Sequence, residues 1–294
     1  MSVFDHDEVS VLTSADGEPV ALHDFGGADD GPPLLLSHGN GLNAGMWAAA
    51  LPTLAPHFRL YGLDLRGHGR SRPTRRDYSV AREDLAGDVV AAVEAIGGPV
   101  AFAGHSLGAA SAVTAARSHP SPDRLFRGLW LFEPVLVPDD LDRSGDGPSA
   151  LIEMSRRRRM DFGSVEDAIS RFRSKPPYSL CDARSVAGYV EIGTYPTEGG
   201  VRLSCRGEDE ARVFGTMATV DFNQLAAIDV PALVVSGAAV NEANSLPPKL
   251  APRIAEALGH GEWLEVDGLS HFGPMEAPEA VAGSIVGFFG RLPG

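Results

Sequence analysis

Short apolar runs alternate with helical patterns along most of this 294-residue chain, and this alternation constrains its fold more than any other feature. The runs typical of buried strands are, in order, 33–37, 59–64, 100–103, 128–132, 230–236 and 262–268. The helical patterns cover 46–54, 80–96, 107–117, 249–258 and 278–292. Because strands joined through helices pair by right-handed crossovers, this order predicts an α/β fold with a mostly parallel sheet. Asp16-Gly17 predicts an additional hairpin before it. Binding residues are expected beyond the C-terminal ends of the parallel strands.

The alternation is interrupted over residues 137–223, where the chain becomes charged. The stretches "MSRRRRMDF", "SVEDAISRFRS" and "RGEDEARVF" have helical patterns, and "SKPP" and "TYPTEGG" are expected to break them. We therefore predict a helical insertion over 137–223, between core segments 1–136 and 224–294. The four cations Arg156 to Arg159 are typical of a solvated, salt-bridged surface. A second hypothesis is that one of them reaches a carboxylate on a substrate.

Composition excludes several classes of function. The chain has 25 basic and 39 acidic residues, and its net charge of −14 repels nucleic acid and anionic membranes. The acidic start "MSVFDHDEVS" lacks a basic and an apolar region, and no run of about 18 apolar residues occurs. These features predict a soluble, cytoplasmic protein without a membrane span. Cys181 and Cys205 have no metal-ligand spacing, and they are either ordinary thiols or a single bridge.

The stretch "AFAGHSLGAASA", residues 101–112, places one serine between an apolar run and a helical pattern. A Gly-X-Ser-X-Gly sequence at such a point is typical of a sharp strand-to-helix turn that exposes a nucleophilic hydroxyl. The alternative is that Ser106 only caps the helix. Both interpretations are open on this motif alone.

Acyl transfer also needs two oxyanion donors and a base. Leu107 follows the serine and can supply one backbone N–H, and Asn40 in the loop "SHGNGLNAGMW" can supply the other. His271, in "DGLSHFGPMEAP" after the last apolar run, has the position expected of the base. His105 is expected to pack or hydrogen-bond beside the serine, since consecutive residues at such a turn point apart.

Taken together, four motifs resemble those of the α/β-hydrolase superfamily, and the resemblance extends over nearly the whole chain. They are, in order, "HGNG", "DLRGHGRS", "GHSLG" and "SHFGPMEAPE". The resemblance implies an eight-stranded, mostly parallel sheet with helices on both faces and a cap inserted after strand six. It also implies that Asp64 and Arg66 fix a loop instead of acting as catalysts.

The acid of the expected triad departs from the common pattern of this superfamily. Most members have an aspartate shortly after strand seven, but here "VSGAAVNEANS" has Val240 at that spacing, followed by Asn241 and Glu242. A minority place a glutamate after strand six, where this chain has Glu133 in "LWLFEPVLVP". An acid at a strand end can orient the histidine and stabilise its protonated form, so we favour Glu133 and keep Glu242 as the alternative.

Serine at the nucleophile position implies acyl transfer to water, since dehalogenases and epoxide hydrolases of the superfamily use aspartate. The sequence therefore predicts a serine esterase for a small, partly apolar carboxylic ester, with no metal and no organic cofactor. The same residues are compatible with hydrolysis of a carbon–carbon bond or a lactone, with perhydrolysis, or with a ligand sensor of low turnover. Fold analogy alone specifies neither the substrate nor the oligomeric state.

Overall fold

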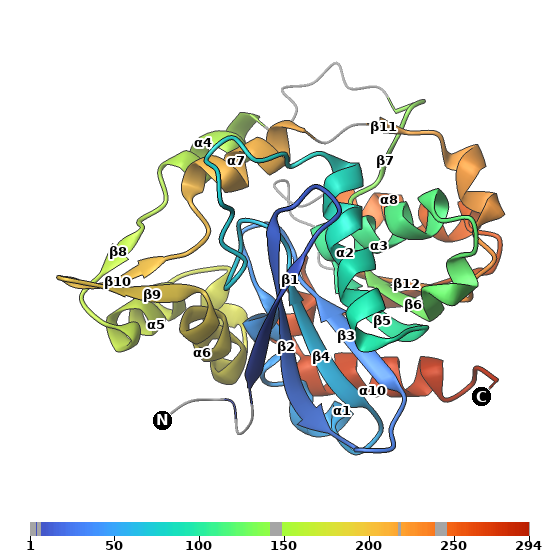
Figure 1. Ribbon diagram of the computed structural model, residues 1–294, viewed down its shortest axis with the longest axis horizontal. Coiled ribbons are helices and arrows are strands. Elements are labelled where there is room, and N and C mark those ends of the chain that lie inside the picture. Colours follow the sequence, from blue (N-terminus) through green and yellow to red (C-terminus); the bar gives the residue numbers. More distant parts are fainter. Residues whose placement is uncertain (1–3, 5–6, 142–148, 217–218, 239–245, 294) are drawn as a thin grey trace.

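A computed structural model describes residue 4 and residues 7–141, 149–216, 219–238 and 246–293. Its centre is an eight-stranded sheet with the order β1-β2-β4-β3-β5-β6-β12-β13 (Figure 1). The strands are β1 (Glu8–Thr13), β2 (Pro19–Gly27), β3 (Pro33–Ser37), β4 (Arg59–Asp64), β5 (Val100–His105), β6 (Phe126–Phe132), β12 (Ala232–Gly237) and β13 (Gly261–Val266). The β1-β2 and β2-β4 pairs are antiparallel, and the other pairs are parallel. The predicted hairpin and mostly parallel sheet are confirmed.

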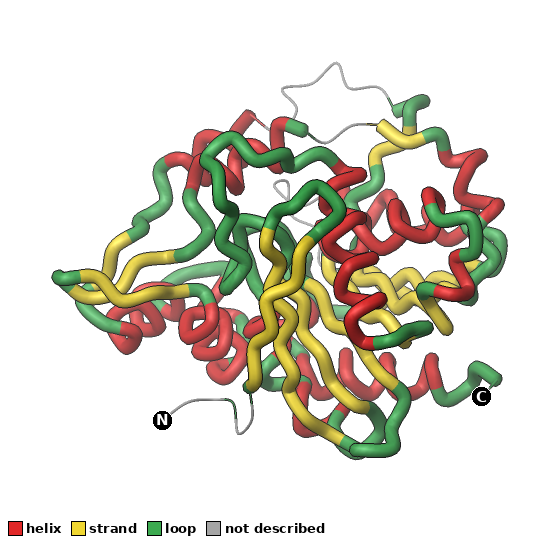
Figure 2. Tube along the Cα trace, in the orientation of Figure 1, coloured by secondary structure: helices red, strands yellow, loops and turns green. Residues whose placement is uncertain are grey.

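Helices cover both faces of this sheet (Figure 2). The helices of the sheet region are α1 (Leu51–Leu54), α2 (Arg82–Ile96), α3 (Leu107–Ser118), α8 (Leu246–Ala257), α9 (Gly273–Glu276) and α10 (Pro278–Phe289). The short 3₁₀ turns there are η1 (Ala44–Trp47), η2 (Pro122–Arg124) and η4 (Phe222–Ala227). Apolar side chains of α2, α3 and α8 pack on one face, and those of η1, α1 and α10 pack on the other. Burial on both faces explains why the central strands are continuous apolar runs.

One predicted helix is wrong in extent. The pattern over 46–54 predicted a single helix, but the structure has η1 and the four-residue helix α1. Asn43 starts η1 early, because its side-chain oxygen accepts the N–H of Gly45. Pro52 lies in the first turn of α1, a position where its missing N–H is tolerated.

Between β6 and β12 the chain forms helices, a three-stranded sheet that lies to the left in Figure 1, and a separate two-stranded sheet. The elements are β7 (Val137–Pro138), α4 (Ser149–Arg156), β8 (Asp161–Phe162), α5 (Val165–Arg173), η3 (Tyr178–Leu180), α6 (Ala183–Ile192), β9 (Thr194–Thr197), β10 (Gly200–Leu203), α7 (Gly207–Gly215) and β11 (Thr219–Val220). The helices predicted for this segment are present, and β8, β10 and β9 add an antiparallel sheet that the sequence did not predict. The "TYPTEGG" stretch, expected to be a break, forms one side and the turn of a hairpin. Its threonines and tyrosine favour strands, and Pro196 lies on the edge strand, where a missing N–H is tolerated.

Helix α6 packs directly on η1, backbone against backbone. A Cβ on Gly45 would lie 2.1 Å from the carbonyl oxygen of Gly188, and a Cβ on Gly188 would lie 2.4 Å from that of Gly45. The side-chain amide of Asn43 also donates to the carbonyl of Tyr189 at 2.9 Å. These contacts attach the 137–223 segment to the loop that follows β3.

Candidate active site

Ser106 follows β5. Its backbone has a φ of 50° and a ψ of −107°, a conformation that residues other than glycine rarely adopt. Its N–H donates to the carbonyl of Phe132 at 2.9 Å. The flanking glycines are needed for space: a Cβ on Gly104 would lie 2.8 Å from the nitrogen of Ala109, and one on Gly108 would be equally close to the loop after β3. The Gly-X-Ser-X-Gly sequence thus lets two backbone segments pass beside a strained serine.

The hydroxyl of Ser106 makes no capping hydrogen bond to α3, so the cap interpretation is wrong. Instead, Oγ lies 3.0 Å from Nε2 of His271. Nδ1 of the same imidazole lies 2.5 Å from Oε2 of Glu133. Since a carboxylate only accepts, this network assigns the proton to Nδ1 and leaves Nε2 to accept the serine proton.

Glu133 begins the loop after β6, and it also has a positive φ, of 44°. Its N–H donates to the carbonyl of Val235, and its Oε1 accepts the N–H of Gly237 at 2.9 Å. The carboxylate is fully buried, with one oxygen on a loop amide and the other on His271. The alternative acid, Glu242, lies outside the described residues.

The loop that carries His271 follows β13 and is fixed by its own hydrogen bonds. Ser270 donates its hydroxyl to Glu276 at 2.5 Å. Nε2 of His105 donates to the carbonyl of His271 at 2.8 Å. Burial, and then the neighbouring His271, hold the pKa of His105 well below its usual value. His105 is therefore a neutral, buried donor that supports the loop, as its place beside the serine predicted.

Two backbone N–H groups near Ser106 are the predicted candidates for an oxyanion hole. Leu107 is the first residue of α3, where the helix leaves its N–H without an internal partner. Asn40 lies in the loop after β3, and a Cβ on the preceding Gly39 would come 3.4 Å from the Cβ of Ser106. Within the described part of the chain, neither the Asn40 N–H nor the Leu107 N–H has a protein acceptor.

The side-chain amide of Asn40 is hydrogen-bonded to a neighbouring helix. Its Nδ2 donates to the carbonyl of Glu210 in α7 at 3.0 Å. The next residue, Gly41, donates its N–H to Nε2 of His68. Burial lowers the pKa of His68, and Nδ1 donates to the carbonyl of Arg66, so His68 is a neutral acceptor for the loop. Sequence reasoning missed both His68 and Glu210.

A buried carboxylate fixes the loops on the other side of the site. Asp64, at the end of β4, accepts the N–H of Ala44 at 2.7 Å, the N–H of Arg70 at 2.8 Å and Nε2 of His23 at 2.8 Å. Arg66 pairs with a second buried carboxylate, Asp88, at 2.6 Å. Asp64 and Arg66 therefore hold loops in place, as the family resemblance implied.

Asn40, Ser106 and Leu107 line one cavity. Its other walls are mainly apolar and come from α2, α3, the loop after β6 and α7; they include Leu85, Ala110, Val135, Val213 and Phe214. An apolar cavity with a few polar groups is the usual form of a small-molecule site.

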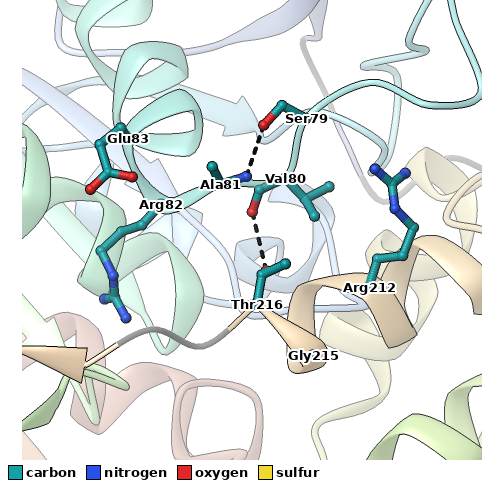
Figure 3. Close-up of a pocket in the computed structure, with 8 residues that line it drawn as sticks. All are labelled: Ser79, Val80, Ala81, Arg82, Glu83, Arg212, Gly215 and Thr216. Carbon is teal, nitrogen blue, oxygen red and sulfur yellow. Dashed lines mark hydrogen bonds between the residues drawn. The ribbon is translucent and has the colours of Figure 1, made fainter.

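A second hollow adjoins this cavity and shares Val80, Arg82 and Thr216 with it. Figure 3 shows the end of α7 opposite the segment that leads into α2, with Thr216 Oγ1 donating to the carbonyl of Val80 at 3.3 Å. Arg212 and Arg82 lie on the two sides of the hollow (Figure 3). The end of α7 thus forms part of the wall of both spaces.

The arginine run divides into two kinds of residue. Three members form exposed ion pairs, which are Arg156 with Glu208, Arg157 with Glu153, and Arg159 with Asp167. Arg158 instead points inward, where it pairs with Glu210 and donates to the hydroxyl of Tyr189. The expected solvated surface is thus correct for three of the four arginines.

Other candidate sites are limited in the described residues. Cys181 and Cys205 are free, buried thiols, and burial raises the pKa of Cys181 to about 12. Across the described ranges, no group of three or more His, Cys, Asp or Glu side chains is arranged to hold a metal ion. The same part of the chain has no helix that is long and apolar enough to cross a membrane.

Comparison with known proteins identifies the family. The model of the alpha/beta hydrolase family matches residues 34–284. The chain belongs to the alpha/beta hydrolase family. The eight-stranded sheet described above is the α/β-hydrolase fold.

Several known proteins are similar to this chain. Protein phosphatase methylesterase 1 from Bos taurus is 36% identical over 149 residues, which are 48% of this chain and only 36% of the relative's length. A pimeloyl-[acyl-carrier protein] methyl ester esterase from Xanthomonas campestris pv. campestris is 27% identical over 90% of this chain and 97% of its own. The structure of a thermophilic esterase from Thermogutta terrifontis superposes with a TM-score of 0.70 and 25% identity, covering 97% of this chain and 99% of that one.

Proposed function

We propose that this protein is a serine esterase that cleaves a small, partly apolar carboxylic ester through an acyl-enzyme. The observation that carries the proposal is the continuous line from the Ser106 hydroxyl through His271 to Glu133, with contacts of 3.0 and 2.5 Å. Each contact is within hydrogen-bonding distance, as a nucleophile, a base and an orienting acid require. Two relatives named as methylesterase and methyl ester esterase support this reaction class.

In the proposed reaction, each proton and each bond has a defined place. Oγ of Ser106 attacks the ester carbonyl carbon while Nε2 of His271 takes its proton, and Glu133 stabilises the imidazolium. The N–H groups of Asn40 and Leu107 hold the oxyanion that forms. The carbon–oxygen bond then breaks, and His271 returns the proton to the departing alcohol. Water, deprotonated by His271, attacks the acyl-enzyme and releases the acid and the free serine.

The 137–223 segment is the cap in this proposal, and residues 1–136 and 224–294 are the hydrolase core. Support comes from α7, since Val213 and Phe214 line the cavity that contains Ser106. The apolar walls favour an ester with an apolar acyl or alcohol group. A cytoplasmic location and the absence of an organic cofactor stay predictions of the sequence.

Esters can be separated experimentally from the other reactions that this site could support. Purified protein is incubated with a fluorophosphonate probe and with p-nitrophenyl esters of two to eight acyl carbons, beside the Ser106→Ala variant. We expect labelling and ester turnover, both abolished by the substitution. Labelling with negligible turnover of every ester would favour a ligand sensor or a carbon–carbon, lactone or peroxide reaction. Absence of labelling would contradict a serine nucleophile.

A further inference from the structure

The loop that carries the candidate oxyanion donor is held from two sides. On the core side, His68 accepts the N–H of Gly41 at 3.0 Å. On the other side, the side chain of Asn40 donates to the carbonyl of Glu210, and the hydroxyl of Tyr189 donates to the carbonyl of Gly41 at 3.2 Å. Both partners on this second side belong to the 137–223 segment, Tyr189 to α6 and Glu210 to α7. The donor's position therefore depends on how α6 and α7 are held.

One side chain joins these two partners. Arg158 directs Nη1 to the carboxylate of Glu210 and donates from Nη2 to the hydroxyl of Tyr189 at 2.7 Å. The side chains of Arg158 and Glu210 are only 15% and 16% exposed. A planar guanidinium can bind two partners in fixed directions, which an ammonium group cannot do.

The Glu210 carboxylate also lies against the loop itself. A Cβ on Gly41 would come 2.7 Å from Cδ and Oε1 of Glu210. Gly41 has a φ of +76°, a value at which a side chain would also strain the backbone. The ion pair and the loop are therefore packed directly together, with Gly41 leaving room for the carboxylate.

We propose that Arg158 is a positioning residue, which holds Glu210 and Tyr189 against Asn40 and Gly41 and so sets the direction of the Asn40 N–H. The inference rests on the proposed function, since it concerns the oxyanion donor of that reaction. Arg158 reaches the reacting atoms only through its two partners. The run of four arginines therefore contributes one residue, Arg158, to the candidate site and three residues to the surface.

The proposal predicts different effects of Arg158 substitutions on kcat and on KM. An oxyanion donor binds the charge that develops in the transition state more strongly than the ground-state carbonyl, so its displacement lowers kcat more than it raises KM. Removal of one complete donor costs about 100- to 1000-fold in kcat in a serine hydrolase. Because Arg158 only positions the donor, we expect a smaller loss of roughly 10- to 100-fold in kcat, with KM changed by less than about threefold.

The test uses the full chain with Arg158→Met, Arg158→Lys and the matched control Arg157→Met. Arg157 is the neighbouring member of the run, is 81% exposed and pairs with Glu153. The measurements are kcat and KM with the best p-nitrophenyl ester, and circular dichroism for the fold. We expect the kcat loss for Arg158→Met, a partial recovery for Arg158→Lys, and wild-type constants for Arg157→Met.

A wild-type kcat in folded Arg158→Met would overturn the proposal, as would a loss confined to KM. If Arg158→Met does not fold, Tyr189→Phe decides, because it removes only the hydroxyl between Arg158 and Gly41. A severalfold fall in kcat in that variant supports the proposal, and an unchanged kcat contradicts it. Failure of the proposed function is distinct, since the wild-type protein itself would then neither turn over esters nor react with the fluorophosphonate.

Discussion

One histidine–carboxylate pair lies on strands of the central sheet and another lies in loops that follow its strands, and the two pairs differ in what the second ring nitrogen contacts. His23, on β2, contacts Asp64 at 2.8 Å through Nε2 and Asp7 at 2.9 Å through Nδ1. His271, after β13, contacts Glu133 through Nδ1, but its Nε2 faces the Ser106 hydroxyl. The His23 side chain is fully buried, whereas that of His271 is 15% exposed.

The difference separates a structural cation from a group that can move a proton. Burial alone would lower the pKa of His23, but Asp64 and Asp7 raise it to about 9, so this ring is protonated at neutral pH. Both of its N–H groups then bind carboxylates, which joins β2 to the end of β4 through Asp64 and to the segment before β1 through Asp7. His271 has one nitrogen free of any carboxylate, so it can take and return a proton. The first pair is expected to control stability and the second to control activity.

We expect the largest loss of activity when the proton acceptor or the nucleophile is removed. We expect Ser106→Ala and His271→Ala each to lower kcat by about 10⁵- to 10⁶-fold, as in other serine hydrolases. The double variant should be no worse than either single variant, because the two residues act as a unit. The melting temperature of Ser106→Ala should change little, since that substitution removes only a hydroxyl group. A double variant much slower than both single variants would contradict a shared step.

The second prediction concerns the acid. Glu133→Gln keeps the shape of the side chain but removes its charge, so the imidazole loses the partner that fixes its tautomer. We expect kcat to fall by about 10⁴-fold, the cost of the equivalent change in another serine triad. Glu242→Gln is the matched control and should have little effect. The reverse ranking of the two variants in kcat would move the acid to the position after β12.

The third prediction uses Asp64→Asn to test the pair that we expect to control stability. This substitution removes one of the two carboxylates that contact the buried His23 cation, leaving Asp7, and weakens the bonds to Ala44 and Arg70. Breaking a buried pair costs about 3 to 5 kcal/mol, which urea unfolding should detect. Asp29→Asn is the control, because that carboxylate is 95% exposed in its pair with Arg59 and should contribute less than about 1 kcal/mol. Equal stability losses in both variants would show that the Asp64 cluster is not special.

The smallest effect is a dependence of stability on pH. The pKa of His23 is about 9 in the folded protein and about 6.5 in the unfolded chain. Its contribution is therefore complete below pH 6.5 and is lost as the pH rises through 9. We expect about 2 to 3 kcal/mol of this contribution to disappear between pH 7 and 9.5. The measurement is urea unfolding across that range, and His23→Gln should lack this fall. An equal fall in His23→Gln would assign it to other groups.

The sequence predicted the parts of this fold that depend on local pattern. The central strands could be predicted because burial on both faces requires continuous apolar runs. The turn at Ser106 could be predicted because its tight backbone requires flanking glycines. The β9-β10 hairpin was missed, because its short strands contain a proline and have no clear alternation. The contacts of Arg158 and His68 could not be read, since each joins residues far apart in the chain and depends on tertiary packing.

The contact between Gly45 and Gly188 restricts how this sequence can diverge. The carbonyl oxygen of each residue closes the other position to a side chain, at 2.1 and 2.4 Å, and the side chains of Asn43 and Ala48 add to the crowding. A substitution at one position therefore cannot be rescued by a smaller residue at the other, because that residue is already glycine. Compensation would have to come from a shift of the whole of α6 away from η1. In a saturation library we accordingly expect these two positions to tolerate no replacement, singly or in combination, even though neither belongs to the candidate active site.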